Sequence, residues 1–298
     1  MSRPRLLFVS PRFLFPMDQG GKIRTGNILR AMKGGAFDLT LASPAPEDHA
    51  RYAADTAAAC DRFVWWPERQ PSPIRRVMAL ASRLPVAAAT DRSAAGRAVV
   101  GQALAERPDV VVVDFPHADV LVPGRIEAAS LMFTHNVEAE IFERHANRAR
   151  GLWRLIWADQ SRKMTRLEQD SLARYDTVLA VSERDRDALK KRYHLPAVEA
   201  IETGVDLDFY AMNPVEAAAD PGPDGGTIVF TATMSWAANV DGIHFLLDEV
   251  FPLLLRARPK IRAVIIGRNP PAALSDKIRE RGLAVTLTGF VDDIRPHV

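Results

Sequence analysis

Residues 109–114 have the sequence Asp-Val-Val-Val-Val-Asp, in which four apolar side chains follow one another without a polar break. A strand that is buried on both faces needs this pattern, which is typical of a parallel sheet covered by helices. Similar runs in the first 212 residues alternate with helical patterns, and this alternation predicts a doubly wound α/β architecture. The other strands expected there are 5–10, 38–42, 62–66, 129–134 and 176–181.

The same alternation restarts after a break in composition. Residues 213–226 contain three prolines and three glycines, which predicts a linker. Beyond the linker, the expected strands are 227–233, 262–267 and 284–289, and the expected helices are 240–258 and 272–281. A doubly wound sheet usually has about five or six strands. We therefore expect a complete first domain at 1–212 and an incomplete second domain at 227–298.

Composition excludes several classes of protein. The chain has 39 Lys and Arg residues against 37 Asp and Glu residues, and this near balance argues against a dedicated nucleic-acid-binding protein. Cys60 is the only cysteine, so an intramolecular disulfide and a zinc site built from cysteines are excluded. The apolar run at 6–10 is too short for a signal-peptide core, and no segment is long enough to span a bilayer. The expected location is the cytoplasm.

Two segments combine basic and aromatic side chains. Residues 69–97 follow Trp65 and Trp66 and carry six arginines against a single acid, Asp91. A cationic amphipathic segment of this kind can lie on an anionic membrane surface, and a solvated helix is the alternative. In the second segment, 141–174, Trp153 and Trp157 have the spacing of one helix face, which favours a place in the core.

Six short motifs follow one another along the chain. They are Gly20-Gly-Lys-Ile-Arg24, Thr134-His-Asn-Val-Glu138, Val181-Ser-Glu-Arg184, Glu202-Thr-Gly-Val-Asp206, Phe230-Thr-Ala-Thr-Met-Ser-Trp-Ala-Ala-Asn-Val-Asp241 and Thr288-Gly-Phe-Val-Asp-Asp-Ile-Arg295. In this order they resemble the retaining GT-B glycosyltransferases of the family-4-like group, which includes sucrose-phosphate synthases and many bacterial polysaccharide transferases. Within that group they resemble the sugar transferases of exopolysaccharide gene clusters. The resemblance implies two Rossmann-like domains, with the acceptor-side domain first and the nucleotide-sugar-binding domain second.

The glycine pair Gly20-Gly21 lacks Cβ atoms, so its backbone can approach a ligand closely. A helix that begins near residues 24–27 would direct free N–H groups at an anion. The resemblance implies that this loop lies near the donor phosphate and the acceptor, with Lys22 and Arg24 as further contacts. A plain glycine-rich turn is the alternative.

His135 directly follows an apolar strand, at the edge where open α/β sheets bind ligands. The resemblance implies that His135 is the catalytic side chain and lines the donor sugar, and that Asn136 and Glu138 bind donor or acceptor beside it. The residues alone leave two alternatives open: a histidine that ends a strand, and a glutamate in the first turn of a helix. Ser182 also has two interpretations, a residue of the site and a helix N-cap, and its position after a strand favours the N-cap.

In the second domain, the resemblance implies that Asn239, Arg268 and Gly289 contact the donor, the last beside the nucleotide base. Arg268 suits a phosphate, and a solvated arginine is the alternative. The family's Glu-(x)7-Glu element and later glycine-rich loop do not occur before Val298. We therefore expect an incomplete donor site, and little or no transfer by the 298 residues alone.

The implied reaction moves a sugar from a UDP- or GDP-linked donor to a glycan or polyprenyl-linked acceptor with retention, without a metal or other cofactor. The implied setting is exopolysaccharide or cell-envelope synthesis. The resemblance allows two locations for the protein, free in the cytoplasm or peripheral on the inner face of the membrane. Two alternatives stay open. A sugar-nucleotide epimerase of the same fold needs acid and base carboxylates and no acceptor. A non-catalytic, degenerate GT-B-like protein would only bind within a polysaccharide assembly complex.

Overall fold

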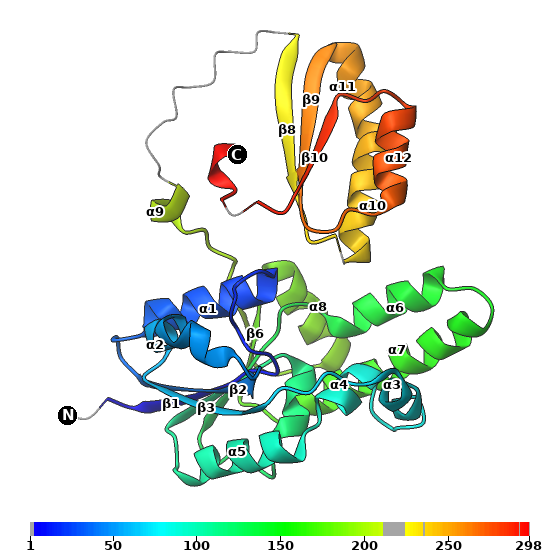
Figure 1. Ribbon diagram of the computed structural model, residues 1–298. Helices are drawn as coiled ribbons and strands as arrows, with labels where there is room; N and C mark the ends of the chain where they lie inside the picture. Colours follow the sequence, from blue (N-terminus) through cyan, green and yellow to red (C-terminus); the bar gives the residue numbers. More distant parts are fainter. Residues whose placement is uncertain (1–2, 211–223, 235, 292, 298) are drawn as a thin grey trace. The chain divides into compact units, whose positions relative to one another are not determined.

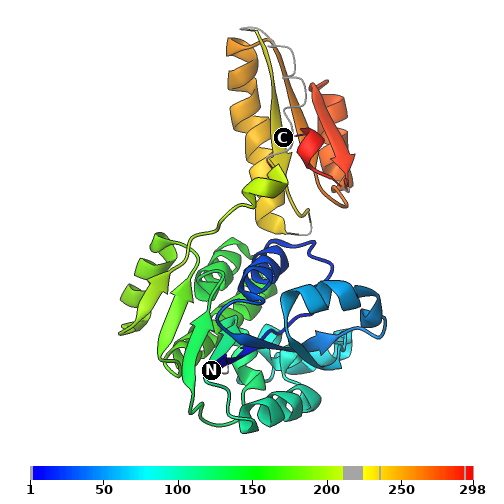
Figure 2. The same ribbon diagram turned by 90° about the vertical axis from the view of Figure 1, so that its left-hand side faces the viewer.

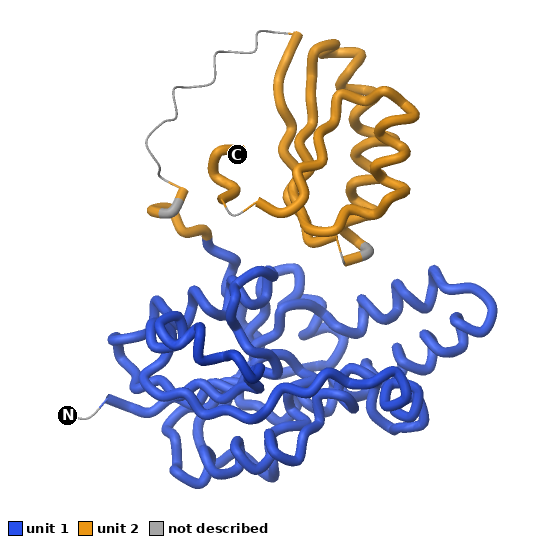
Figure 3. The backbone as a smooth tube through the Cα atoms, in the orientation of Figure 1, with its two compact units in different colours: residues 1–204 blue, residues 205–298 orange. Residues whose placement is uncertain are grey.

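The computed structural model describes residues 3–210, 224–234, 236–291 and 293–297. The chain divides into two compact units, residues 1–204 and residues 205–298, which Figure 3 shows in two colours. Each unit packs helices on a parallel sheet (Figures 1 and 2), as the alternation of patterns predicts. Residues 213–223 of the expected linker lie outside the described residues, and Gly225 and Gly226 already belong to a strand.

The first unit is built on a seven-stranded parallel sheet with the order β3-β2-β1-β4-β5-β6-β7. Its strands are β1 (Arg5–Val9), β2 (Asp38–Ala45), β3 (Arg62–Pro67), β4 (Val110–Asp114), β5 (Ala129–Phe133), β6 (Thr177–Ala180) and β7 (Val198–Ala200). In the centre of the sheet, β1 pairs with β2 on one side and with β4 on the other. The strand order reverses between β1 and β4, and this switch point is where an open sheet leaves room for a ligand.

Helices cover both faces of this sheet. The helices of this unit are α1 (Gly20–Met32), α2 (Ala53–Ala59), α3 (Pro73–Ala79), α4 (Val86–Asp91), α5 (Ala94–Ala105), α6 (Glu138–Arg148), α7 (Leu152–Leu172) and α8 (Glu183–Tyr193). Side chains of a strand alternate between the faces of a sheet, so Leu7 and Val9 pack in one core with α5 and α8. Leu6 and Phe8 pack in the other core with α1 and α2. The valines of β4 divide between these cores in the same way, which confirms a strand buried on both faces.

The second unit opens with the short helix α9 (Leu207–Tyr210) and contains a three-stranded parallel sheet with the order β10-β9-β8. Its strands are β8 (Gly225–Thr231), β9 (Lys260–Ile266) and β10 (Val285–Gly289), and its helices are α10 (Ala237–Phe245), α11 (Phe251–Ala257) and α12 (Ala272–Glu280). Ile243, Leu247, Ile265 and Leu274 are fully buried in one core cluster, and Phe251 is fully buried in a second. The three strands predicted for this part are therefore confirmed.

Two helices differ from their predictions. The helix after β1 begins at Gly20 and not near residues 24–27, so the glycine pair is the first turn of α1. Glycine has a low helix propensity, but burial of Thr25, Gly26 and Leu29 against the sheet fixes this helix. The helix expected at 240–258 is interrupted by a π-helical turn at Leu246–Val250. Pro252 follows that turn and has no N–H to donate, which breaks the regular ladder of hydrogen bonds.

Trp153 is also placed differently. Its side chain is 66% exposed, so the expectation that it lies in the core is wrong. It stands in the first turn of α7, at the tip of the hairpin that α7 forms with α6 (Figure 1), where the helix has little beside it. Trp157, one turn further along, is half-buried and stacks on His145 of α6 with ring centroids 4.5 Å apart. No helix in the described part of the chain has both the length and the apolarity to cross a membrane.

Candidate functional site

Three segments that follow strands meet at the carboxyl edge of the first sheet. β4 ends at Asp114, His135 comes two residues after β5, and α1 begins at Gly20 after the loop that leaves β1. Because β1, β4 and β5 are neighbours in the sheet, their carboxyl ends bring these residues together at the switch point.

His135 and Asp114 form a buried pair. Nε2 of His135 lies 2.7 Å from Oδ1 of Asp114, and the two side chains are only 8% and 2% exposed. Thr25 of α1 donates its hydroxyl to the other carboxylate oxygen at 3.2 Å. A carboxylate accepts hydrogen bonds, so the pair places a proton on Nε2, and in a ring that carries one proton Nδ1 is then the acceptor.

Nδ1 of His135 lies toward the first turn of α1. A Cβ atom on Gly21 would be 3.9 Å from this nitrogen and 3.3 Å from Cζ of Phe115, whereas one on Gly20 would meet nothing within 4 Å. Gln19, the N-cap residue, makes no side-chain hydrogen bond to the helix. The turn at Gly20 and Gly21 therefore has backbone N–H groups that Gln19 does not cap, beside the imidazole.

Phe115 supports the imidazole at the expense of backbone strain. Its φ of 71° is left-handed, a conformation that costs a non-glycine residue about 1–2 kcal/mol. Its ring stacks on His135 with centroids 4.1 Å apart, and its N–H donates to the carbonyl of Phe133 at 2.8 Å. Strain of this kind gathers at functional sites, where the surroundings hold it in place.

The side chain of Arg24 is held by three residues of the first unit. Its guanidinium lies 5.2 Å from the ring centroid of Phe133, donates to Oγ1 of Thr203 at 2.6 Å, and also donates to the carbonyl of Ile201. Burial lowers the pKa of Arg24, and the charge of Asp114 acts in the opposite direction. Lys22, on the same helix, pairs with Asp18 at 3.5 Å. Both cations thus have protein partners at the edge of the site.

Glu138 is the first residue of α6, which agrees with the first-turn alternative. Its backbone N–H donates to Oε1 of Glu168 at 2.8 Å, and Ala139 donates to Oε2 at 3.1 Å. Burial, and then the charge of Glu168, raise the pKa of Glu138 to about 7, while a hydrogen bond with Asn136 opposes the shift. The motif after β5 therefore combines an imidazole with a carboxyl group that titrates near neutral pH.

Ser182 accepts from the N–H of Asp185 at 3.1 Å, so the N-cap interpretation of that residue is confirmed.

A second imidazole lies near the first. The ring centroid of His117 is 5.1 Å from that of Phe115, and its side chain is 9% exposed. Burial lowers the pKa of His117 to about 3, so the ring is neutral and its 3.6 Å approach to Asp91 is not an ion pair. Burial raises the pKa of Asp91 to about 6. Neither ring nitrogen of His117 has a hydrogen-bond partner among the described residues.

Of the residues predicted in the second unit, Arg268 and Gly289 lie at the carboxyl ends of β9 and β10, and Asn239 lies in α10. The guanidinium of Arg268 sits over the ring of Phe290, 3.8 Å from its centroid. Gly289 has a φ of 73° and accepts a hydrogen bond from the N–H of Gly267 at 2.9 Å. Asn239 donates its side-chain amide to the carbonyl of Thr233 at 3.0 Å. The unit therefore brings Arg268 and Gly289 together beside one exposed aromatic ring.

The structure thus joins Gly21, Arg24 and His135 of the predicted set in one place. It adds Asp114, Thr25 and Phe115, which the sequence analysis does not assign to the site. A signal for Asp114 exists, because an acid directly after four buried valines must lie at the carboxyl edge of the sheet. Nothing in the sequence indicates the left-handed backbone of Phe115. No three His, Cys, Asp or Glu side chains gather as metal ligands in the described part of the chain.

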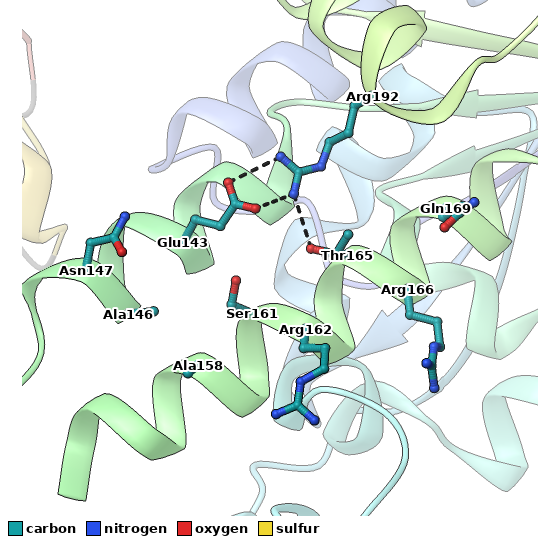
Figure 4. A pocket seen from close by; sticks show the side chains of 10 residues that line it. All are labelled: Glu143, Ala146, Asn147, Ala158, Ser161, Arg162, Thr165, Arg166, Gln169 and Arg192. Atoms are coloured by element: carbon teal, nitrogen blue, oxygen red, sulfur yellow. Dashed lines mark hydrogen bonds and ion pairs between the residues drawn. The ribbon is translucent and has the colours of Figure 1, made fainter.

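A separate hollow of about 680 Å³ lies between α6, α7 and α8 (Figure 4). None of the predicted site residues lines it. Arg192 and Glu143 form an ion pair across it, and Arg192 also donates to Thr165 at 3.4 Å. Its central charges are therefore satisfied by the protein itself.

Two family models match the sequence. The model described as Glycosyltransferase Family 4 matches residues 19–209, and the model described as Glycosyl transferases group 1 matches residues 225–298. The chain belongs to glycosyltransferase family 4. It is a glycosyltransferase with the GT-B fold, and its switch-point residues lie within the first of the two matches.

Solved structures share the fold of this glycosyltransferase. The UDP-forming α,α-trehalose-phosphate synthase of Burkholderia xenovorans is 10% identical with a TM-score of 0.55, and the similarity covers 97% of this chain and 74% of that one. The N-terminal domain of trehalose-6-phosphate phosphatase from Candida albicans is 10% identical with a TM-score of 0.53, over 99% and 74% of the two chains. No curated protein matches the sequence.

Proposed function

We propose that this glycosyltransferase moves a sugar from a UDP- or GDP-linked donor to a hydroxyl of a glycan or polyprenyl-linked acceptor, with retention of configuration and without a resident cofactor. The proposed setting is the synthesis of exopolysaccharide or another cell-envelope polysaccharide at the cytoplasmic side of the membrane. The buried pair of His135 and Asp114 carries this proposal, because it fixes one imidazole nitrogen as an acceptor at the switch point.

Each site residue has a proposed task. Nδ1 of His135 accepts a hydrogen bond from a hydroxyl of the donor sugar and so positions the reacting carbon. The first turn of α1, at Gly20 and Gly21, directs backbone N–H groups at the departing diphosphate, where negative charge grows in the transition state. Lys22 and Arg24 add positive charge at the same edge, and Asn136 and Glu138 contact the donor or the acceptor.

In the second unit, Asn239, Arg268 and Gly289 are the proposed donor contacts. Phe290 offers a half-exposed ring face beside Arg268, and such a face suits stacking by a nucleotide base. Arg268 suits a phosphate oxygen because its guanidinium presents several donors in one plane.

A substrate screen tests the activity. Two purified proteins are compared: the 298 residues alone, and the same residues extended by the rest of a donor domain with the family's Glu-(x)7-Glu element and glycine-rich loop. Each is incubated with UDP- and GDP-sugars, with and without polyprenyl-linked glycans, and released nucleoside diphosphate is measured. We expect little or no release by the 298 residues alone. From the extended protein we expect release that requires the acceptor, with NMR of the product showing the anomeric configuration of the donor. An epimerised donor without any acceptor, an inverted product, or donor binding with no conversion by the extended protein would each contradict the proposal.

The Asp114→Asn variant tests the role of the pair. The amide keeps the shape of the carboxylate but can donate to Nε2, which favours the wrong tautomer. In the extended protein we expect turnover to fall about 100-fold or more, with a much smaller change in the KM of the donor. ¹⁵N NMR of His135 should show the proton on Nε2 in the unmodified protein and lose that signature in the variant. Thr25→Val, which removes only the 3.2 Å bond, is the control and should leave the tautomer unchanged.

A further inference from the structure

Six large apolar side chains of the first unit are far more exposed than the rest. Ile74, Val77 and Met78 stand on α3, and Leu152, Trp153 and Leu155 stand at the start of α7. Each is at least 66% exposed, whereas no other exposed large apolar side chain described in this unit exceeds 48%. We name these six residues the apolar ridge. Exposed apolar side chains in such a cluster mark a contact surface.

The two halves of the ridge belong to one helical lobe. Lys163 of α7 donates to the carbonyl of Leu80, just beyond α3, at 2.8 Å. Gln160 of α7 accepts from the N–H of Val86, at the start of α4, at 2.7 Å. Figure 1 shows α3 and the α6–α7 hairpin on the same side of the first unit. The helix α3 has no buried residue of its own, and Ile74, Val77 and Met78 belong to none of the buried apolar clusters.

Basic residues predominate in the two segments that carry the ridge, and Asp159, one turn beyond Leu155 on α7, pairs with Lys163 at 2.6 Å and with Arg162 at 3.7 Å. Residues 69–90, which contain α3, carry four arginines and no acidic residue, and residues 144–158, around the hairpin tip, also carry four arginines and no acidic residue. Two of these arginines, Arg75 and Arg76, lie between the exposed apolar residues of α3. A third, Arg154, lies between Trp153 and Leu155. The sheet edge that carries His135 has a different composition, with Asp114, Asp91 and Glu138 nearby.

We infer that the apolar ridge docks on the surface of an anionic lipid bilayer. Short apolar helix segments with arginines among them can insert their apolar side chains below the headgroups while the guanidinium groups reach the phosphates. A tryptophan at the tip suits the boundary between headgroups and acyl chains. A protein partner would need a matching apolar face rimmed by acids, and a second copy of this chain would bring arginines against arginines. The docking itself does not depend on the proposed function. Only its purpose, which is to bring the enzyme to a lipid-linked acceptor, rests on that function.

Flotation with vesicles tests the docking directly. The full chain is mixed with vesicles of phosphatidylcholine and phosphatidylglycerol, or of phosphatidylcholine alone, and bound protein is measured at low and high salt. We expect at least tenfold tighter binding to the anionic vesicles, lost at high salt because the charges are then screened. These vesicles contain no sugar acceptor, so the result is independent of transfer activity.

Two variants with matched controls locate the surface. R75Q/R76Q should weaken binding to anionic vesicles about 30-fold, and W153S/L155S should weaken it at least tenfold and abolish any blue shift of tryptophan fluorescence. The controls R256Q/R279Q and F245S/L253S change equally exposed residues of the second unit and should bind like the unmodified protein. Circular dichroism confirms that each variant is folded.

Three outcomes would overturn the inference. They are equal binding to both kinds of vesicle, unchanged binding of both ridge variants, and equal weakening by the controls. A dimer in light scattering that the ridge variants dissociate would assign the ridge to a second copy instead. Loss of acceptor-dependent transfer with intact vesicle binding would contradict the proposed function and leave the docking in place.

Discussion

Gly20 and Gly21 are neighbours in the chain but have different surroundings. Both lie in the first turn of α1, where glycine is a poor helix former. Only Gly21 faces other side chains, those of Phe115 and His135. A side chain at position 20 would therefore change only the helix propensity of the turn, whereas one at position 21 would also fill space beside His135.

The pair Gly20→Ala and Gly21→Ala makes that contrast measurable. Gly20→Ala should raise the free energy of unfolding by up to about 1 kcal/mol, because alanine favours the helix and meets nothing. Gly21→Ala places a methyl group 3.3 Å from Phe115 and should weaken donor binding at least tenfold as that ring and the imidazole shift. Denaturant melts and calorimetric titration with a nucleotide sugar check both. Equal effects of the two variants on donor binding would show that the site does not require the space beside Gly21.

Glu138 makes stability depend on pH. Its pKa is raised from 4.5 to about 7 in the folded protein, so the folded form holds the proton more tightly than the unfolded form. The contribution of the protonated group is complete below 4.5 and is lost as the pH rises through about 7. We expect the free energy of unfolding of the unmodified protein to fall across this range relative to that of Glu138→Gln. Urea melts at several pH values check this, and parallel curves for the two proteins would contradict it.

At the scale of elements, α6 depends on a residue from another helix. Glu168 of α7 is completely buried and accepts the backbone N–H groups of Glu138 and Ala139 at the start of α6. The hydroxyl of Tyr193 of α8 donates to the same carboxylate at 2.6 Å. One side chain therefore ties three helices together directly behind the motif that carries His135.

Replacing that side chain should loosen α6. Glu168→Ala leaves two N–H groups and a buried hydroxyl without an acceptor, and we expect the free energy of unfolding to fall by about 2 kcal/mol or more. Glu140→Ala is the matched control, because Glu140 pairs with the exposed Arg184 and should cost less than about 0.5 kcal/mol. Thermal melts compare the stability of the two variants, and hydrogen exchange of the α6 amides shows whether this helix opens more readily. A loss no larger than that of the control would show that the cap is unimportant.

The same scale shows what sequence patterns reveal. Strands β1 to β6 and β8 to β10 were predictable because each is a run of apolar residues between helical patterns. The strand β7 has only three residues, Val198–Ala200, too few to form such a run. The start of α1 was not predictable from propensity, because packing of Leu29 and Thr25 outweighs the preference of glycine. His135 could be named from its motif, but Asp114 lies 21 residues earlier and only the strand order brings them together.

On the scale of the whole molecule, the chain consists of two units with separate cores. Buried clusters around Leu7 and around Leu29 belong to residues 1–204, and a smaller cluster around Ile265 belongs to residues 205–298. A smaller core buries less apolar surface per residue and gives less stability. Phe245 and Leu253 are exposed and add little apolar area to that core.

We therefore expect two unfolding transitions. Differential scanning calorimetry should show the second unit melting first, and a fragment of residues 1–204 should reproduce the later transition of the full chain. Fluorescence of Trp66, which is buried in the first unit, should follow the later transition only. A single transition of the full chain, absent from the fragment, would show that the units do not fold separately.

The central position of β1 has a consequence for how the protein is made. Arg5 donates its N–H to Asp109, a partner that follows 104 residues later in the chain. At about 5–20 residues per second, a ribosome needs roughly 5–20 s to produce those residues. Throughout that interval one edge of β1 is an open strand with apolar residues on both faces, the kind of surface on which nascent chains aggregate. The pace of translation between β1 and β4 thus belongs to the conditions under which this fold forms.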